Sequence, residues 1–388
     1  MYRASGNPTP AIGSLKTAVK NVARSIREET GAKIDGFRRR RLTVPVSSVP
    51  PLTGTVYFLV GDHDLPAGGI RVIYRHVDIL NAAGIPAAVL HRRRGFRCTW
   101  FEHETQVTDT TSVSVTPSDL LVVSELDVDL LRGLPRGFPH VVFNQNVHLT
   151  WRRDAEWAIQ HYSRGTDLRA VVTVSRHSAE LIAHAFVDTP VTVVHPSLDR
   201  DLFRLGNAER PRRIGYMPRR GKEDAALVLA ILRARGVLDQ WEVVPLQNLR
   251  SEKVGDALRT CRIYMTFAHQ EGFGLPAVEA MGCGAYVIGY HGFGGLEHFR
   301  PDFSRPVETG DALGVARAIE ATLEIEAVDP QWCQRQGRAA SQFVHKAYSP
   351  QREAAEVVAF YSSLLPTQRS ITSGSSYERA KEGPRPNQ

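Results

Sequence analysis

Two glutamates eight positions apart flank a glycine-rich turn in the second half of the chain, where residues 269–284 read HQEGFGLPAVEAMGCG. The small residues Gly272 and Gly274 let a ligand approach the backbone, and Pro276 suits the first turn of a helix. The free amides at the start of such a helix point at any bound phosphate. The segment therefore predicts an anion site at a helix N-terminus.

Each glutamate has its own predicted role beside that anion. Glu279 lies about a turn into the predicted helix and can accept hydrogen bonds from two vicinal hydroxyls, as a ribose presents them. Glu271 precedes the turn and lies near whatever is attached beyond the phosphates. One site is thus predicted to bind ribose, diphosphate and sugar.

This spacing resembles the Glu-x7-Glu signature of retaining glycosyltransferases of the GT-B fold, family four type, also called glycosyl transferases group 1. Three further motifs resemble that family in their order along the chain. They are Gly68-Gly69 followed by a helix, Arg219-Arg220-Gly221-Lys222 after a strand, and Gly294-Gly295-Leu296-Glu297. By the order of motifs and strands, the similarity covers roughly residues 54 to 365.

The resemblance implies transfer of a hexose from a nucleotide diphosphate sugar to a saccharide or lipid-linked acceptor, with retention of configuration. It implies a front-face reaction in which the leaving phosphate helps to deprotonate the acceptor, so no enzyme nucleophile, metal or cofactor is expected. Guanidinium, ammonium and helix amides can stabilise the charge that builds on the departing diphosphate. The expected catalytic residues are Glu271, Arg219, Lys222, Asn146 and His148, and the expected donor-binding residues are Gly68, Gly69, Arg220, Gly272, Phe273, Gly274, Leu275 and Glu279.

The sequence departs from the family pattern on the acceptor side. The family often places a histidine after the N-domain strand that ends at the cleft, whereas this chain reads FNQNVH over residues 143–148. Either Asn146 replaces that histidine by hydrogen bonding, or His148 reaches in from two residues further on. Asp62 and Asp64 follow the first predicted strand and are candidate acceptor contacts, while the similar pair Asp127 and Asp129 is expected at the surface.

Alternating apolar strands and amphipathic helices predict an α/β chain with two Rossmann-like, doubly wound domains facing a central cleft, the GT-B architecture. Strands are predicted at residues 55–60, 86–90, 120–123, 141–143, 171–174, 213–217, 243–244, 263–267 and 286–288. The predicted divisions are a basic arm (1–50), an acceptor domain (51–203), a donor domain (204–348), a helix crossing back to the first domain (349–366) and a flexible tail (367–388). Ser349 is the predicted N-cap of that helix and Pro350 its first residue.

The charge distribution argues against nucleic acid as a partner. The net charge is +7, but residues 1–50 hold ten Lys and Arg against three Asp and Glu, and the remainder holds 38 residues of each sign. Aromatic residues are not interleaved with the basic ones, as single-strand binders require. Four separated cysteines without a CxxC pair, and histidines without HxxxH or HxH spacing, predict neither disulfides nor a metal site. The lack of a long apolar run predicts a cytoplasmic protein.

The basic arm carries an apolar helical stripe with cations around it, formed by Leu15, Val19, Val22 and Ile26. Two interpretations remain open: residues 1–46 bind an anionic membrane surface peripherally, or the arm is a disordered or domain-packed extension. Alternatives for the whole chain are a GT-B scaffold that binds nucleotide sugar without turnover, a nucleic-acid-binding protein that uses the arm, and a GT-B phosphorylase or epimerase.

Overall fold

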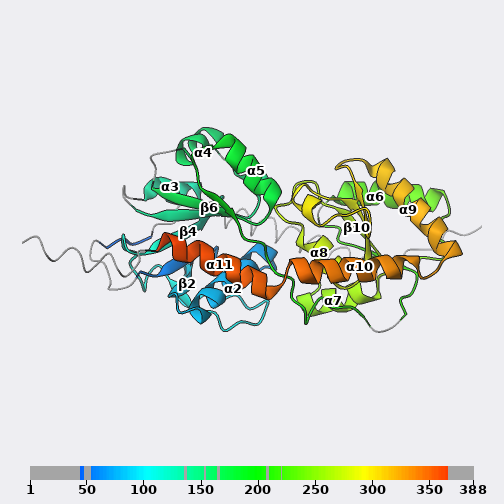
Figure 1. The fold of residues 1–388 in the computed structure, drawn as a ribbon, viewed down its shortest axis with the longest axis horizontal. Coiled ribbons are helices and arrows are strands. Elements are labelled where there is room, and N and C mark those ends of the chain that lie inside the picture. The colour runs from blue at the N-terminus through cyan, green and yellow to red at the C-terminus, as the bar shows by residue number, and fades with distance from the viewer. Residues whose placement is uncertain are drawn as a thin grey trace, which may run out of the picture.

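The computed structural model describes residues 44–47, 54–134, 138–152, 154–163, 167–206, 209–219 and 221–365. The predicted tail, Arg220 and the basic arm apart from residues 44–47 lie outside the described residues. Figure 1 shows two domains side by side along the long axis of the molecule, each built around its own parallel sheet.

The sheet of the N-terminal domain has seven strands in the order β3-β2-β1-β4-β5-β6-β7, and every neighbouring pair is parallel. The chain starts in the middle of the sheet, moves to one edge and returns to build the other side, which is the doubly wound topology. The strands are β1 (Val56–Leu59), β2 (Ala87–His91), β3 (Val107–Asp109), β4 (Leu120–Ser124), β5 (His140–Asn144), β6 (Leu168–Thr173) and β7 (Val191–Val193).

The C-terminal domain has a five-stranded parallel sheet in the order β12-β11-β10-β8-β9. Its central strands are buried along their whole length, as expected for a parallel sheet covered on both faces. The strands are β8 (Arg213–Tyr216), β9 (Glu242–Pro245), β10 (Ile263–Phe267), β11 (Tyr286–Tyr290) and β12 (Ser304–Val307).

Helices connect the strands of both sheets, and among the described residues none is long and apolar enough to cross a membrane. The α-helices are α2 (Gly68–Ala82), α3 (Val128–Gly133), α4 (Ala155–His161), α5 (Arg176–Ala185), α6 (Lys222–Ala234), α7 (Ser251–Thr260), α8 (Leu275–Gly282), α9 (Ala312–Val328), α10 (Trp332–Ala347) and α11 (Pro350–Leu364). Two short 3-10 helices are η1 (Val147–Leu149) and η2 (Gly294–Glu297).

Helix α11 follows the C-terminal domain in sequence but packs on α2 of the N-terminal domain, as Figure 1 shows. Ser349 caps it by accepting from the backbone N–H of Arg352, and Pro350 is its first residue, as predicted. Arg75 Nε on α2 donates to Glu353 Oε2 on α11 at 2.5 Å, and Glu353 is almost completely buried. The chain therefore crosses between the two domains twice.

Every predicted strand is present, with its ends shifted by a few residues at most. Three strands were missed, and all of them lie at the edges of the sheets: β3, β7 and β12. Edge strands bury less of each residue, so β3 and β7 are short and partly polar, while β12 contains Pro306, which cannot donate to a ladder.

Candidate active site

The segment predicted to bind an anion is the loop between β10 and the N-terminus of α8. Gly274 is the N-cap of α8 with φ 86° and ψ 43°, a left-handed conformation that favours glycine. Pro276 lies in the first turn, and no side chain caps the helix. Among the described residues, no side chain therefore occupies the amide end of α8, where the sequence predicts that an anion binds.

The Glu271 backbone is fixed against the loop after β11. Its N–H donates to Gly292 O at 2.9 Å, and its carbonyl accepts from Gly294 N at 3.3 Å. A Cβ on Gly294 would lie 2.2 Å from Gly272 O, so the close approach of the two loops requires glycine. The Glu271 residue is 9% exposed. The predicted motif at 294–297 thus lies directly beside the first glutamate.

Glu279 pairs with an arginine from the other domain. Arg71 Nη2 on α2 lies 3.1 Å from Glu279 Oε1, and Arg71 Nη1 donates to Ser251 Oγ at 3.3 Å. Burial raises the pKa of the Glu279 carboxyl, and the positive charge of Arg71 opposes that rise. The sequence analysis did not single out Arg71, although this residue lies two positions after Gly69 on the same helix.

The predicted glycines lie where the two domains touch. A Cβ on Gly272 would lie 1.7 Å from the backbone O of Gln145, and one on Gly69 would lie 2.4 Å from Gln145 Oε1. Gln145 Nε2 donates to Gly69 O at 2.9 Å. A Cβ on Gly68 would approach Leu275 Cδ1 to 2.8 Å. Gly68 and Gly272 therefore serve the close contact between the domains, whereas Gly69 contacts Gln145 within the N-terminal domain.

Phe273 has a different place from its neighbours in the loop. Its ring is 4% exposed and packs edge to face on Tyr348 at 4.9 Å and on His298 at 5.3 Å. The side chain belongs to the core of the C-terminal domain, so only the Phe273 backbone can face a ligand.

The structure brings both Asn146 and His148 to the boundary between the domains. Asn146 Nδ2 donates to Gln270 O at 3.1 Å, next to Glu271. The His148 ring packs against Phe293, at 5.4 Å between centroids, and burial lowers the pKa of this histidine. Both of the alternatives left open by the sequence thus contact the C-terminal domain.

Lys222 is the exposed first residue of α6, and Arg219 lies exposed just before it. Gly221 between them has φ 69°, and a Cβ there would lie 2.3 Å from Phe267 O at the end of β10. His269 Nε2 and Asp224 Oδ2, 2.6 Å apart, join the start of α6 to the same loop. The cationic turn is therefore adjacent to the segment that leads into Glu271.

Asp62 and Asp64 form hydrogen bonds within the N-terminal domain. Asp62 Oδ1 accepts from Arg92 N at 3.0 Å, and Asp64 Oδ1 accepts from Thr99 N at 2.6 Å. Both carboxylates thus hold the loop that follows β2. Asp127 is 3% exposed, so the expectation that this aspartate lies at the surface is wrong: it accepts from Ser124 N and starts α3.

Glu125 is a buried carboxyl that the sequence reasoning missed. It follows β4, and its carboxylate accepts from Gln145 N at 3.3 Å and Asn146 N at 3.1 Å. Burial raises the pKa of Glu125 to about 7, and these hydrogen bonds oppose part of the rise. The available signal was a polar pair, Ser124 and Glu125, at the carboxyl end of an apolar strand.

His195 joins both domains and the returning helix. Its Nε2 lies 3.4 Å from Glu297 Oε2 of η2, and its Nδ1 lies 3.2 Å from Glu356 Oε2 of α11. Burial alone would lower the pKa of His195, but these two carboxylates outweigh it and raise the pKa. No cluster of three or more His, Cys, Asp or Glu suited to a metal ion occurs among the residues described.

Two doubly wound parallel domains that meet at the carboxyl ends of their strands define the GT-B class of fold. Solved structures agree: sucrose-phosphate synthase from Thermosynechococcus elongatus aligns with a TM-score of 0.60 at 15% identity, over 80% of this chain and 99% of that one. The Anabaena protein Alr3699/HepE, in complex with UDP and glucose, aligns with a TM-score of 0.59 at 14% identity, over 80% of this chain and all of its own.

The sequence comparisons show similarity in the C-terminal domain. Residues 221–342 match the family model described as glycosyl transferases group 1. A curated relative, an alpha-1,6-glucosyltransferase of Actinobacillus pleuropneumoniae serotype 7 (strain AP76), is 26% identical over 128 residues. That match spans 32% of this chain and 38% of the relative's length.

Proposed function

We propose that this protein is a retaining glycosyltransferase that moves a hexose from a nucleotide diphosphate sugar to a saccharide or lipid-linked acceptor without a metal ion. The observation that carries the proposal is the position of two buried glutamates around the uncapped N-terminus of α8. Both lie against segments of the opposite domain, Glu271 next to the Gly272 contact with Gln145 and Glu279 beside Arg71.

We assign each part of the donor to residues around the N-terminus of α8. Glu279 accepts hydrogen bonds from the ribose hydroxyls, and the amide end of α8 binds the diphosphate together with Arg219 and Lys222. Glu271 then faces the sugar. The exposed positions of Arg219 and Lys222, next to the loop that holds Glu271, support this order.

In the proposed reaction, the bond between the anomeric carbon and the phosphate oxygen breaks, and its electron pair stays on the nucleoside diphosphate. The acceptor hydroxyl attacks the same face of the sugar, and its proton passes to the departing phosphate oxygen. Two cations and the helix amides stabilise the new negative charge, which is the part a divalent metal plays in other transferases. Asn146 and His148 orient the sugar from the N-terminal domain. Asn146 Nδ2 donates to the backbone carbonyl of Gln270, next to Glu271.

The names of relatives support the choice of substrates. The matched relative is named as a glucosyltransferase, and the Anabaena protein is described with UDP and glucose bound. These names favour a hexose donor for this chain. The two buried glutamates favour an enzyme over a scaffold without turnover, because a scaffold has no need of Glu271 once the nucleotide is bound.

Nucleotide binding tests the site assignment. Isothermal calorimetry and thermal shift with UDP, GDP and dTDP should give one clear ligand, since a ligand at 100 times its dissociation constant adds about 2.7 kcal/mol of apparent stability. Glu279→Ala should weaken that binding by roughly 1 to 3 kcal/mol, because charge-assisted hydrogen bonds to the ribose are lost. Unchanged affinity in this variant would remove Glu279 from the site, and binding of none of the three would remove the proposed donor class.

The proposal includes a peripheral position on the inner face of a membrane, through residues 1–46. The support comes from sequence: cations near an anionic leaflet each contribute about 1 kcal/mol, and the arm holds the whole net charge. We expect full-length protein to sediment with anionic but not neutral vesicles, and to dissociate in high salt. Equal sedimentation of a variant lacking residues 1–46 would refute a membrane role for the arm.

A further inference from the structure

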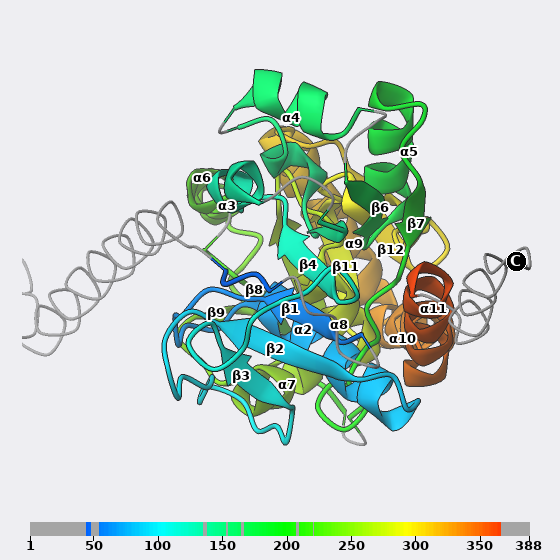
Figure 2. The same cartoon turned by 90° about the vertical axis from the view of Figure 1, so that its left-hand side faces the viewer.

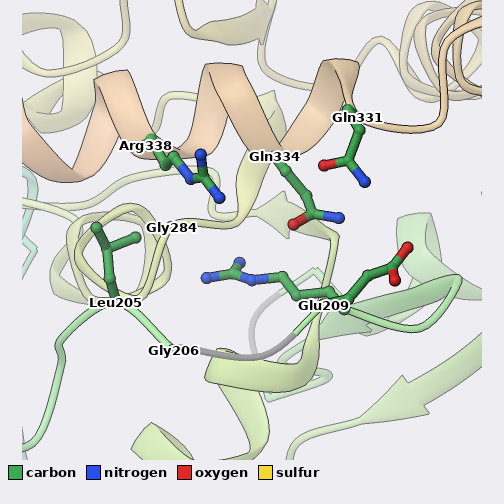
Figure 3. A pocket seen from close by; sticks show the side chains of 8 residues that line it. Leu205, Gly206, Glu209, Gly284, Gln331, Gln334 and Arg338 are labelled. Carbon is green, nitrogen blue, oxygen red and sulfur yellow. The ribbon is translucent and has the colours of Figure 1, made fainter.

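A cavity lies in the C-terminal domain, between the chain segment that enters this domain and helix α10. Its volume is about 200 Å³, well above the size that holds one water molecule. Figure 3 shows Gln334 and Arg338 projecting from α10 into this space, with Leu205, Glu209 and Gly284 around it. Gly284 follows the C-terminal end of α8, whereas the candidate active site lies at the N-terminal end of the same helix.

Arg210 lines this cavity as a buried cation. It is 6% exposed, and its guanidinium donates to two backbone carbonyls, Cys261 O and Cys283 O. The partial negative charge at the end of α8 offsets only part of a full positive charge. Within the described part of the chain, no carboxylate forms an ion pair with Arg210, and a buried charge without a counter-ion is costly.

A second cation increases this imbalance. Arg338 lines the same cavity, and burial, together with the nearby charges of Arg338 and Arg262, lowers the pKa of Arg210. Arg262 has its own buried partner, Glu326, at 2.8 Å. The Glu326 carboxylate therefore balances the charge of Arg262 and not that of Arg210. Glu209 at the rim is exposed and, among the described ion pairs, has none with either arginine.

Gln334 supplies a hydrogen-bond donor without an acceptor. The residue is 8% exposed, and within the described ranges of the chain its Nε2 has no hydrogen-bond partner. An unpaired buried N–H is destabilising unless a ligand or water satisfies it. Gly284 lies in close contact with the other side chains of the cavity wall, since a Cβ on it would lie 2.4 Å from Leu205 Cδ2 and 2.7 Å from Arg210 Nη2.

We propose that this cavity binds a small oxyanion, either inorganic phosphate or the phosphate group of a small metabolite. Arg210 and Arg338 balance its charge, and Gln334 Nε2 donates to one of its oxygens. The site is separate from the donor site by the length of α8, and the proposal does not depend on glycosyl transfer.

Calorimetry with inorganic phosphate and with glucose 1-phosphate tests the proposal and separates the two sources. We expect one of them to bind the full-length protein, and Arg338→Ala or Gln334→Leu to weaken that binding about tenfold, as loss of a hydrogen bond to a charged group predicts. The matched control is Arg335→Ala on the same helix, because Arg335 is not among the residues that line the cavity and is paired with Asp329, and this variant should leave binding within about twofold. No binding of either ligand would overturn the proposal.

The active site also has cations that can bind phosphate, so location must be tested too. Binding that survives Arg338→Ala and disappears in Lys222→Ala belongs to the donor site and would overturn the proposal. Crystals soaked in selenate should show an anomalous peak between Arg210, Gln334 and Arg338. A peak there without any binding in solution would mean an adventitious ion only, which also overturns the proposal.

Discussion

Arg71 Nη2 and Glu279 Oε1 lie 3.1 Å apart and come from opposite domains of the protein. Their side chains are 17% and 11% exposed, so the pair is largely shielded from water. Glu279 is the residue proposed to bind the ribose of the donor. A ribose that uses both carboxylate oxygens has to displace this guanidinium, so the ion pair competes with donor binding.

Arg71→Ala should therefore bind the preferred nucleoside diphosphate more tightly than the wild type. A partly exposed ion pair contributes about 1 kcal/mol, which corresponds to roughly fivefold in affinity. Calorimetry on both proteins measures the difference. The effect should vanish in the Glu279→Ala background, because the carboxylate for which the guanidinium and the ribose compete is absent there. Weaker binding by Arg71→Ala would mean that the guanidinium contacts the nucleotide instead.

Gly272→Ala should impair the contact between the domains. The added Cβ would lie 1.7 Å from the backbone O of Gln145, which cannot yield as a flexible side chain would. We expect about a hundredfold loss of donor turnover, because misplacement of about 1 Å has that effect, and a larger radius of gyration in X-ray scattering. Gly133→Ala is the matched control, since the Cβ would meet no described atom within 4 Å. Wild-type turnover and a wild-type radius of gyration in Gly272→Ala would contradict a requirement for the close contact between Gly272 and Gln145.

Glu125→Gln should change how stability depends on pH. The pKa of Glu125 rises from its ordinary value of 4.5 to about 7 in the fold, because burial favours the neutral acid. Its contribution to stability is therefore complete below pH 4.5 and is lost as the pH rises through 7, by about 3 kcal/mol at most.

Glutamine resembles the neutral acid and does not ionise, so the Glu125→Gln variant does not lose this stability as the pH rises. Between pH 5 and pH 8, the melting temperature of Glu125→Gln should increase relative to that of the wild type as the pH rises. Glu279, whose pKa is also raised, is present in both proteins and cancels in the comparison. A constant difference across this range would show that Glu125 is ionised in the fold throughout.

The sequence predicted the elements whose signals are local. Buried strands such as β10 are continuous apolar runs, and the turn at Gly274 and Pro276 carries its own conformational signature. The same holds for Ser349 at the start of α11. Edge strands were missed because their residues are only partly buried and carry little apolar pattern.

The contacts between the domains could not be predicted from the sequence. Arg71 and Glu279 are 208 positions apart, and a helical arginine gives no indication of its partner. Asp62 and Asp64 resembled ligand-binding residues because they follow a strand at the carboxyl edge of the sheet. Their hydrogen-bond donors in the structure, Arg92 N and Thr99 N, depend on the path of the next loop, which spacing does not determine.

Donor turnover by the wild type and by Glu271→Ala, in excess EDTA, tests the proposed sugar transfer most directly. Release of nucleoside diphosphate from UDP-, GDP- and dTDP-sugars is measured, with calorimetry of nucleoside diphosphate binding on the same samples. We predict that the wild type turns over one donor in EDTA, and that Glu271→Ala loses this turnover while its nucleotide affinity stays close to that of the wild type. Full turnover by Glu271→Ala would contradict the assignment of this carboxylate to the sugar, and turnover restored only by manganese or magnesium would contradict transfer without a metal ion.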